Sequence, residues 1–183
     1  MDDPARLNAE RVWIVDPLDG TREYGELGRT DWAVHVALWE RGRLVTGAVA
    51  LPAQDVTLVA GTAAATERRP GPLRVVVSRT RPPALALAVA RSLDGEVVEM
   101  GSAGAKVAAV VQGLVDVYVH AGGQYEWDSA APVAVALAAG LHASRIDGSR
   151  LVYNRPDPLL PDLVVCRPEL AERVLAAAYH SRS

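Results

Sequence analysis

The feature that most limits the fold of this chain is an alternation of short apolar runs with longer alanine-rich stretches after residue 72. Apolar runs of about four to eight residues between turn signals predict buried strands, whereas longer amphipathic stretches predict helices. The expected strands are 73–78, 96–100, 114–120, 141–146 and 162–167. The expected helices are 82–93, 103–113, 128–140 and 168–180. This alternation is typical of a layered α/β protein.

The first part of the chain predicts an antiparallel meander instead. The run "RVWIVD" (11–16) is expected to be a buried strand that ends at Asp16, where Pro17 turns the chain out of the sheet. Three further apolar runs predict a hairpin and a third strand, at 31–40, 43–51 and 55–61. The polar, Pro- and Gly-bearing segment between the two patterns is the expected boundary, which divides the chain into subdomains 1–72 and 73–183.

Composition excludes several classes of protein. The 183 residues are 50% hydrophobic and carry a net charge of −3, so we expect a sizeable core and no nucleic-acid-binding surface. No stretch approaches the roughly 20 apolar residues of a membrane helix, and the polar start does not resemble a signal peptide. Cys166 is the only cysteine, so an intrachain disulfide is impossible and a cytoplasmic location is expected.

Two aspartates stand at the rim of the expected core, in "DPLDGT" (16–21). If the chain turns at Pro17, Asp16 and Asp19 can converge, with the Leu18 carbonyl between them. Carboxylate and carbonyl oxygens are the ligands that Mg²⁺ prefers, and two adjacent carboxylates without a cation would repel each other. The alternative is that Asp-Pro and Asp-Gly are ordinary turn dipeptides.

The residues around this segment favour phosphate chemistry. Gly20 and Thr21 are expected at a helix N-terminus, where backbone N–H groups and the helix dipole favour a phosphate oxygen. Asp128, in "WDSAAP", is expected to be the N-cap of a later helix, a role that needs no cation. A cation site beside an anion-binding helix start is what phosphoryl transfer to water requires.

Together, "DPLDGT" and the later "WDSAA" resemble the inositol monophosphatase superfamily of Mg²⁺-dependent phosphatases, and the flanking "DWAVHVALW" and "HAGGQYEWDSAAP" resemble its 3′(2′),5′-bisphosphate nucleotidase branch. The resemblance implies an αβαβα sandwich of the sugar-phosphatase type. It implies two or three Mg²⁺ ions, held by Asp16, the Leu18 carbonyl, Asp19 and Asp128. Gly20 and Thr21 would contact the phosphate, and Thr21 would help to orient the attacking water.

The resemblance also bears on the substrate. Lys106, the only lysine, and Ser102 lie in "GSAGAK", where nucleotidase-like members carry lysine and inositol-type members do not. His120 lies where several nucleotidases place an arginine that could contact a second phosphate. A single surface lysine and a packed strand-end histidine are the alternatives. The implied substrate is 3′-phosphoadenosine 5′-phosphate, with its sulfated precursor PAPS as a related substrate, in sulfate assimilation. The implied quaternary structure is a homodimer.

One departure concerns the front of the chain. Family members carry a Glu-Glu motif shortly upstream of "DPLDGT" that supplies a metal ligand, and these residues do not contain it. The expectation is therefore an N-terminally incomplete sandwich. A misplaced start codon, a truncated gene and a segment supplied from elsewhere would each account for it. Inositol-1-phosphate or fructose-1,6-bisphosphate phosphatase activity is one functional alternative, and an inactive fragment that binds only metal or phosphorylated ligand is another.

Overall fold

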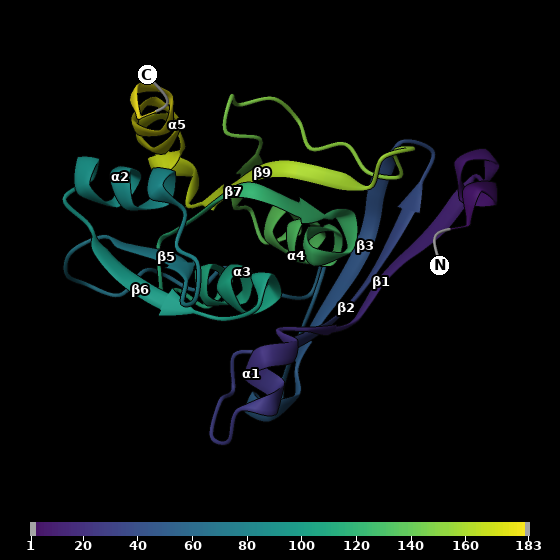
Figure 1. Cartoon of the computed structure of the whole chain (residues 1–183), viewed down its shortest axis with the longest axis horizontal. Helices are drawn as coiled ribbons and strands as arrows, with labels where there is room; N and C mark the ends of the chain where they lie inside the picture. The colour runs from purple at the N-terminus through teal and green to yellow at the C-terminus, as the bar shows by residue number, and fades with distance from the viewer. Residues whose placement is uncertain (1–2, 182–183) are drawn as a thin grey trace.

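The computed structural model describes residues 3–181, which form two β-sheets and the helices between and beside them (Figure 1). The first sheet is antiparallel, has the strand order β1-β2-β3-β4 and confirms the predicted meander. Its strands are β1 (Arg11–Asp19), β2 (Ala33–Glu40), β3 (Arg43–Leu51) and β4 (Val56–Val59). A 3₁₀ turn, Pro4–Asn8, precedes β1.

The second sheet is mixed and has the order β6-β5-β7-β9-β8. Its strands are β5 (Arg74–Ser78), β6 (Glu96–Met100), β7 (Val117–Tyr125), β8 (His142–Ser144) and β9 (Leu159–Cys166). Strands β6, β5 and β7 are parallel, whereas β9 is antiparallel to both β7 and β8. In such sheets ligands bind beyond the carboxyl ends of the parallel strands, which is where the candidate site lies.

The helices complete a layered arrangement. They are α1 (Thr21–Gly25), α2 (Ala84–Ser92), α3 (Ala103–Val111), α4 (Glu126–Ala138) and α5 (Ala171–His180). Helices α3 and α4 pack between the two sheets, and α2 and α5 cover the other face of the second sheet (Figure 1). The predicted α/β layering is confirmed. The division into subdomains at 72 and 73 stays a prediction.

The outer face of the first sheet carries large exposed apolar side chains, including Trp13, Val15, Val36 and Val45. Within residues 3–181 no helix covers this face, so the described layers are sheet, helices, sheet and helices. No helix in this part of the chain has the length and apolar character needed to cross a membrane.

Two predicted boundaries near the site were wrong. Strand β1 does not end at Asp16 but continues through Pro17 to Asp19, with a register shift between Asp16 and Asp19. Proline is tolerated there because β1 is an edge strand of the described sheet, so the missing N–H breaks no ladder. Asp128 is not the N-cap of α4: Tyr125 holds that position, and Asp128 lies three residues inside the helix.

Candidate active site

Three carboxylates meet where β1 ends and α4 begins. One oxygen each from Asp16, Asp19 and Asp128 lies within 4.8 Å of the others. In a regular strand, residues three apart point to opposite faces. The bulge in β1 inserts one extra residue against β2, and so lets Asp16 and Asp19 share a side. The structure therefore brings together all three predicted carboxylate ligands.

The electrostatics of this cluster fit a cation. Burial and the nearby Asp19 raise the pKa of Asp16, although the Leu18 N–H donates to its carboxylate at 3.0 Å. Burial, with further repulsion from Asp19 and Asp16, raises the pKa of Asp128 to about 7. A hard divalent cation is coordinated by carboxylate oxygens and would offset the repulsion among the three aspartates, so this set of ligands suits Mg²⁺.

Asp19 is held by a dense set of contacts. Its carboxylate accepts hydrogen bonds from the Ser102 hydroxyl at 2.5 Å and from the Gly104 N–H at 2.8 Å. The buried His35 ring lies 3.4 Å away through Nε2, and its Nδ1 is 3.1 Å from the Trp127 carbonyl. Gly104 is required by this closeness, because a Cβ there would lie 1.9 Å from His35 Nε2. His35 is not among the predicted site residues, yet it connects β2 to both sides of the carboxylate cluster.

The turn after β1 is also tightly built. Gly20 has φ +83°, a left-handed conformation that side chains rarely adopt, and a Cβ there would lie 3.1 Å from the Ser102 Cβ. Thr21 begins α1, as predicted, and is exposed. Because α1 has only five residues, its helix dipole is small, and the phosphate contact predicted at Gly20 and Thr21 stays a prediction.

Lys106 is buried beneath the loop of Gly101 and Ser102, which joins β6 to α3. Its ammonium donates to the carbonyl oxygens of Gly101 at 3.0 Å and Ser102 at 2.7 Å, and lies 5.4 Å from the centre of the Tyr118 ring. Burial lowers its pKa to about 8, against the opposing effect of Asp19. Lys106 therefore stabilises the loop that holds Asp19, and the alternative of an unremarkable surface lysine is wrong.

A cavity of about 450 Å³ opens beside these groups. The predicted site residues that line it are Asp19, Gly20, Thr21, Ser102, Lys106, His120 and Asp128. The Nε2–H group of His120 donates a hydrogen bond to the Gly123 carbonyl oxygen at 3.0 Å, and burial lowers the pKa of the His120 ring. The volume lies in the usual range for small-molecule sites.

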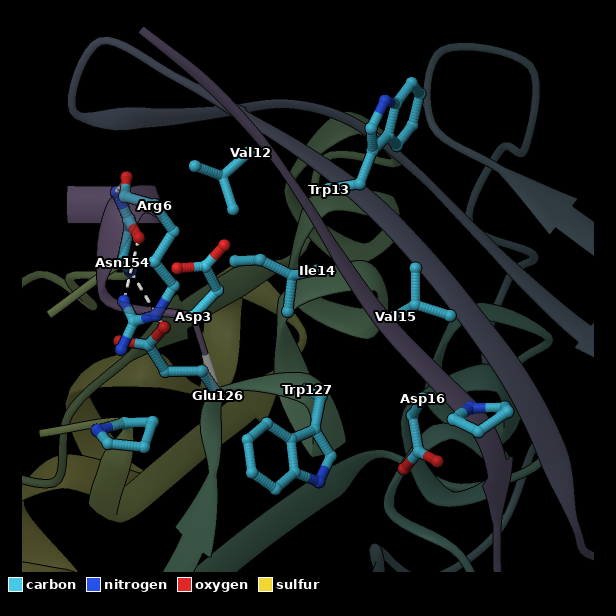
Figure 2. Close-up of a pocket in the computed structure, with 12 residues that line it drawn as sticks. Asp3, Arg6, Val12, Trp13, Ile14, Val15, Asp16, Glu126, Trp127 and Asn154 are labelled. Atoms are coloured by element: carbon cyan, nitrogen blue, oxygen red, sulfur yellow. Dashed lines mark hydrogen bonds between the residues drawn. The ribbon is translucent and has the colours of Figure 1, made fainter. Parts of the chain in front are cut away.

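Asp16 borders a second cavity of about 510 Å³, which runs under β1 between Val12, Ile14 and the start of α4 (Figure 2). Figure 2 shows Asp16 at one end of this space, with Trp127 beside it. The carboxylate cluster thus lies between two cavities. Leu18 lines neither of them, so its predicted role as a carbonyl ligand stays a prediction.

Sequence reasoning missed several residues of the 450 Å³ cavity. Glu23 is buried and accepts a hydrogen bond from Arg79 at 2.9 Å, and Gln124 is buried in β7. The predicted end of β7 at His120 hid Gln124, because the glycines at 122 and 123 indicate a loop. No apolar–polar alternation crosses "VYVHAGGQY", so the sequence holds no local signal that the strand continues to Gln124.

Three carboxylates converge beside a ligand-sized cavity, at the carboxyl ends of the parallel strands of an α/β chain. These features define a small-molecule-binding protein with a candidate divalent-cation site. Comparison with known proteins makes the assignment specific. The sequence model of the inositol monophosphatase family matches residues 2–183. The chain therefore belongs to this family, whose members are metal-dependent.

Named relatives agree. The 3′-phosphoadenosine 5′-phosphate phosphatase of Mycobacterium tuberculosis is 54% identical over 187 residues, which cover 96% of this chain and 69% of the relative. The 3′(2′),5′-bisphosphate nucleotidase CysQ of Salmonella typhimurium is 31% identical over 87% of this chain and 70% of its own length. The crystal structure of CysQ from Bacteroides thetaiotaomicron superposes with a TM-score of 0.81 at 26% identity, over 91% of this chain and 73% of that one.

Proposed function

We propose that this chain is a Mg²⁺-dependent phosphatase that hydrolyses 3′-phosphoadenosine 5′-phosphate to AMP and inorganic phosphate. The observation that carries the proposal is the meeting of Asp16, Asp19 and Asp128 beside the 450 Å³ cavity. The mycobacterial relatives that bear this activity in their names, at 54% identity, support the choice of substrate.

The residues of the cluster and of the turn after β1 have separate roles. Asp16, Asp19, Asp128 and the Leu18 carbonyl would hold Mg²⁺, with two or three ions expected. When bound, Mg²⁺ would polarise the phosphate and lower the pKa of a nearby water molecule. Thr21 would orient this water for attack on phosphorus, while the bond from phosphorus to the ribose 3′-oxygen breaks and that oxygen takes up a proton.

The remaining polar groups would hold the substrate. Gly20 and Thr21 offer N–H groups to the scissile phosphate, and Ser102 fixes the Asp19 carboxylate through its 2.5 Å hydrogen bond. Lys106 and His120 line the cavity, and the Lys106 ammonium would favour a second phosphate group, with the His120 ring beside it as a neutral contact. The sulfated precursor PAPS fits the same assignment, which places the activity near sulfate assimilation. A homodimer and a cytoplasmic location stay predictions from the resemblance.

The test is phosphate release by the purified chain with Mg²⁺, from adenosine 3′,5′-bisphosphate, inositol 1-phosphate and fructose 1,6-bisphosphate. We expect the adenosine bisphosphate to be turned over fastest. Lys106→Ala should slow both this substrate and inositol 1-phosphate, because Lys106 stabilises the loop that holds Asp19, but the loss should be larger for the bisphosphate. Arg91→Ala, an exposed basic residue on α2, is the control and should change neither. Faster turnover of inositol 1-phosphate, or no turnover of any of the three, would contradict the proposal.

A further inference from the structure

The 450 Å³ cavity contains one buried polar side chain that the roles above leave unused. Gln124 is only 7% exposed and lines the cavity, yet neither its amide nitrogen nor its amide oxygen has a hydrogen-bond partner within residues 3–181. Buried amide groups in folded proteins are nearly always paired, so an amide with both atoms unpaired in a cavity wall points to a group that arrives with the ligand.

Other described residues also have unpaired buried atoms, but their positions differ. His35, Trp39, Arg74, Arg79 and Arg167 each have a single such nitrogen, and none of these residues lines the 450 Å³ cavity. Gln124 is the described residue that combines an unpaired side chain with a place in the wall of this cavity.

The backbone around Gln124 is shaped for this placement. The pairing of β7 with β9 shifts register between Ala121 and Gln124. Gly122 and Gly123, inside this shift, have φ values of +116° and +84°. Bulges next to active sites commonly redirect a side chain, and glycines are needed where φ is positive. The local sequence "HAGGQY" therefore builds a bend that ends at Gln124.

The position relative to the carboxylate cluster limits what Gln124 can contact. The Tyr125 N–H donates to the Asp128 carboxylate at 2.6 Å. Standard backbone geometry then places the Gln124 Cα within about 5 Å of that oxygen. The glutamine thus lies at the end of the cavity where the scissile phosphate would be held, and a substrate group that it contacts belongs to the sugar next to that phosphate.

A neutral amide suits a neutral partner. On a nucleoside 3′-phosphate, the neutral polar group beside the ester is the ribose 2′-hydroxyl, which both donates and accepts and so can pair with either amide atom. We propose that Gln124 is a specificity-determining residue that hydrogen-bonds this 2′-hydroxyl. The assignment rests on the proposed function, because it takes the substrate to be a nucleoside 3′-phosphate.

The experiment compares adenosine 3′,5′-bisphosphate with its 2′-deoxy analogue, in the wild-type chain and in Gln124→Met. Methionine preserves the length of the side chain and removes both polar atoms. We expect the wild type to prefer the ribose substrate about tenfold in kcat/KM, and Gln124→Met to reduce this preference to about one. The melting temperature of Gln124→Met should not fall, since no protein partner is lost.

Gln112→Met makes the same change at the end of α3, outside the cavity, and should keep the wild-type preference. Binding of the product, AMP against 2′-deoxy-AMP, with Mg²⁺ and by calorimetry, separates this inference from the proposed activity. If the chain does not hydrolyse the substrate but Gln124→Met still loses the preference for AMP, the assignment of Gln124 stands and the proposed activity fails. An unchanged preference in Gln124→Met, or no preference in the wild type, overturns the assignment.

Discussion

Replacing Asp128 with asparagine should stabilise the metal-free chain at neutral and alkaline pH while removing its ability to hold Mg²⁺. Burial, with repulsion from Asp19 and Asp16, raises the pKa of Asp128 from 3.8 to about 7. Above pH 7 Asp128 is therefore ionised in the metal-free chain, and its buried charge lowers the free energy of unfolding. Asparagine has almost the same shape, and its oxygen can still accept the Tyr125 N–H.

The size of the effect follows from this pKa. A rise from 3.8 to about 7 corresponds to at most about 4 kcal/mol, at about 1.4 kcal/mol for each pKa unit. Between about pH 4 and 7 the folded chain keeps a proton that the unfolded chain has released, so wild-type stability falls as the pH rises through this window. The gain from Asp128→Asn should thus approach about 4 kcal/mol at pH 8 and be smaller by about 2 to 3 kcal/mol at pH 5.

The assay is urea unfolding with EDTA at pH 5 and pH 8, followed by circular dichroism. Asp147→Asn is the matched control: hydrogen bonds from the Ser149 side chain and from the Ser149 N–H lower the pKa of this exposed aspartate, so no gain is expected. Saturating Mg²⁺ should reverse the order, because only the wild type gains stability by binding the ion. An equal gain at both pH values, or a loss at pH 8, would refute the account of the carboxylate cluster.

Two further substitutions test the residues that hold Asp19. Ser102→Ala removes the 2.5 Å hydrogen bond to Asp19 and should weaken Mg²⁺ binding by about tenfold or more in a calorimetric titration. Ser149→Ala is the control and should leave Mg²⁺ affinity unchanged. Equal Mg²⁺ affinities for the two variants would contradict the role of Ser102. Gly104→Ala would place a Cβ 1.9 Å from His35 Nε2 and should lower the free energy of unfolding by about 1 to 3 kcal/mol. Gly25→Ala is the control, because a Cβ there meets no atom within 4 Å. Similar melting temperatures for the two variants would be inconsistent with the packing described.

Much of this arrangement could be predicted from local patterns. The meander and the alternating strands and helices follow from apolar periodicity, and the motif "DPLDGT" alone indicates two of the three carboxylates. Asp128 was also predicted, although its position in α4 was wrong: its carboxylate accepts the Tyr125 N–H from inside the helix.

The rest depends on contacts between distant segments. Nothing near His35 in the sequence indicates that its ring lies against Asp19 and Trp127, because those contacts form only when β2, β1 and α4 pack together. Gln124 was missed because the two preceding glycines indicate a loop, whereas the strand continues through a bulge. Lys106 was singled out as a substrate contact, and its bonds to two loop carbonyls could not be read from the sequence.

The central claim is that Asp16, Asp19 and Asp128 form the cation site of a phosphatase. The most direct measurement is anomalous diffraction from crystals of this chain grown with Mn²⁺ in place of Mg²⁺. We predict an anomalous peak within coordination distance of one oxygen from each of the three carboxylates, lost in Asp19→Asn. A Mn²⁺ peak elsewhere, with none between these carboxylates, would contradict the claim.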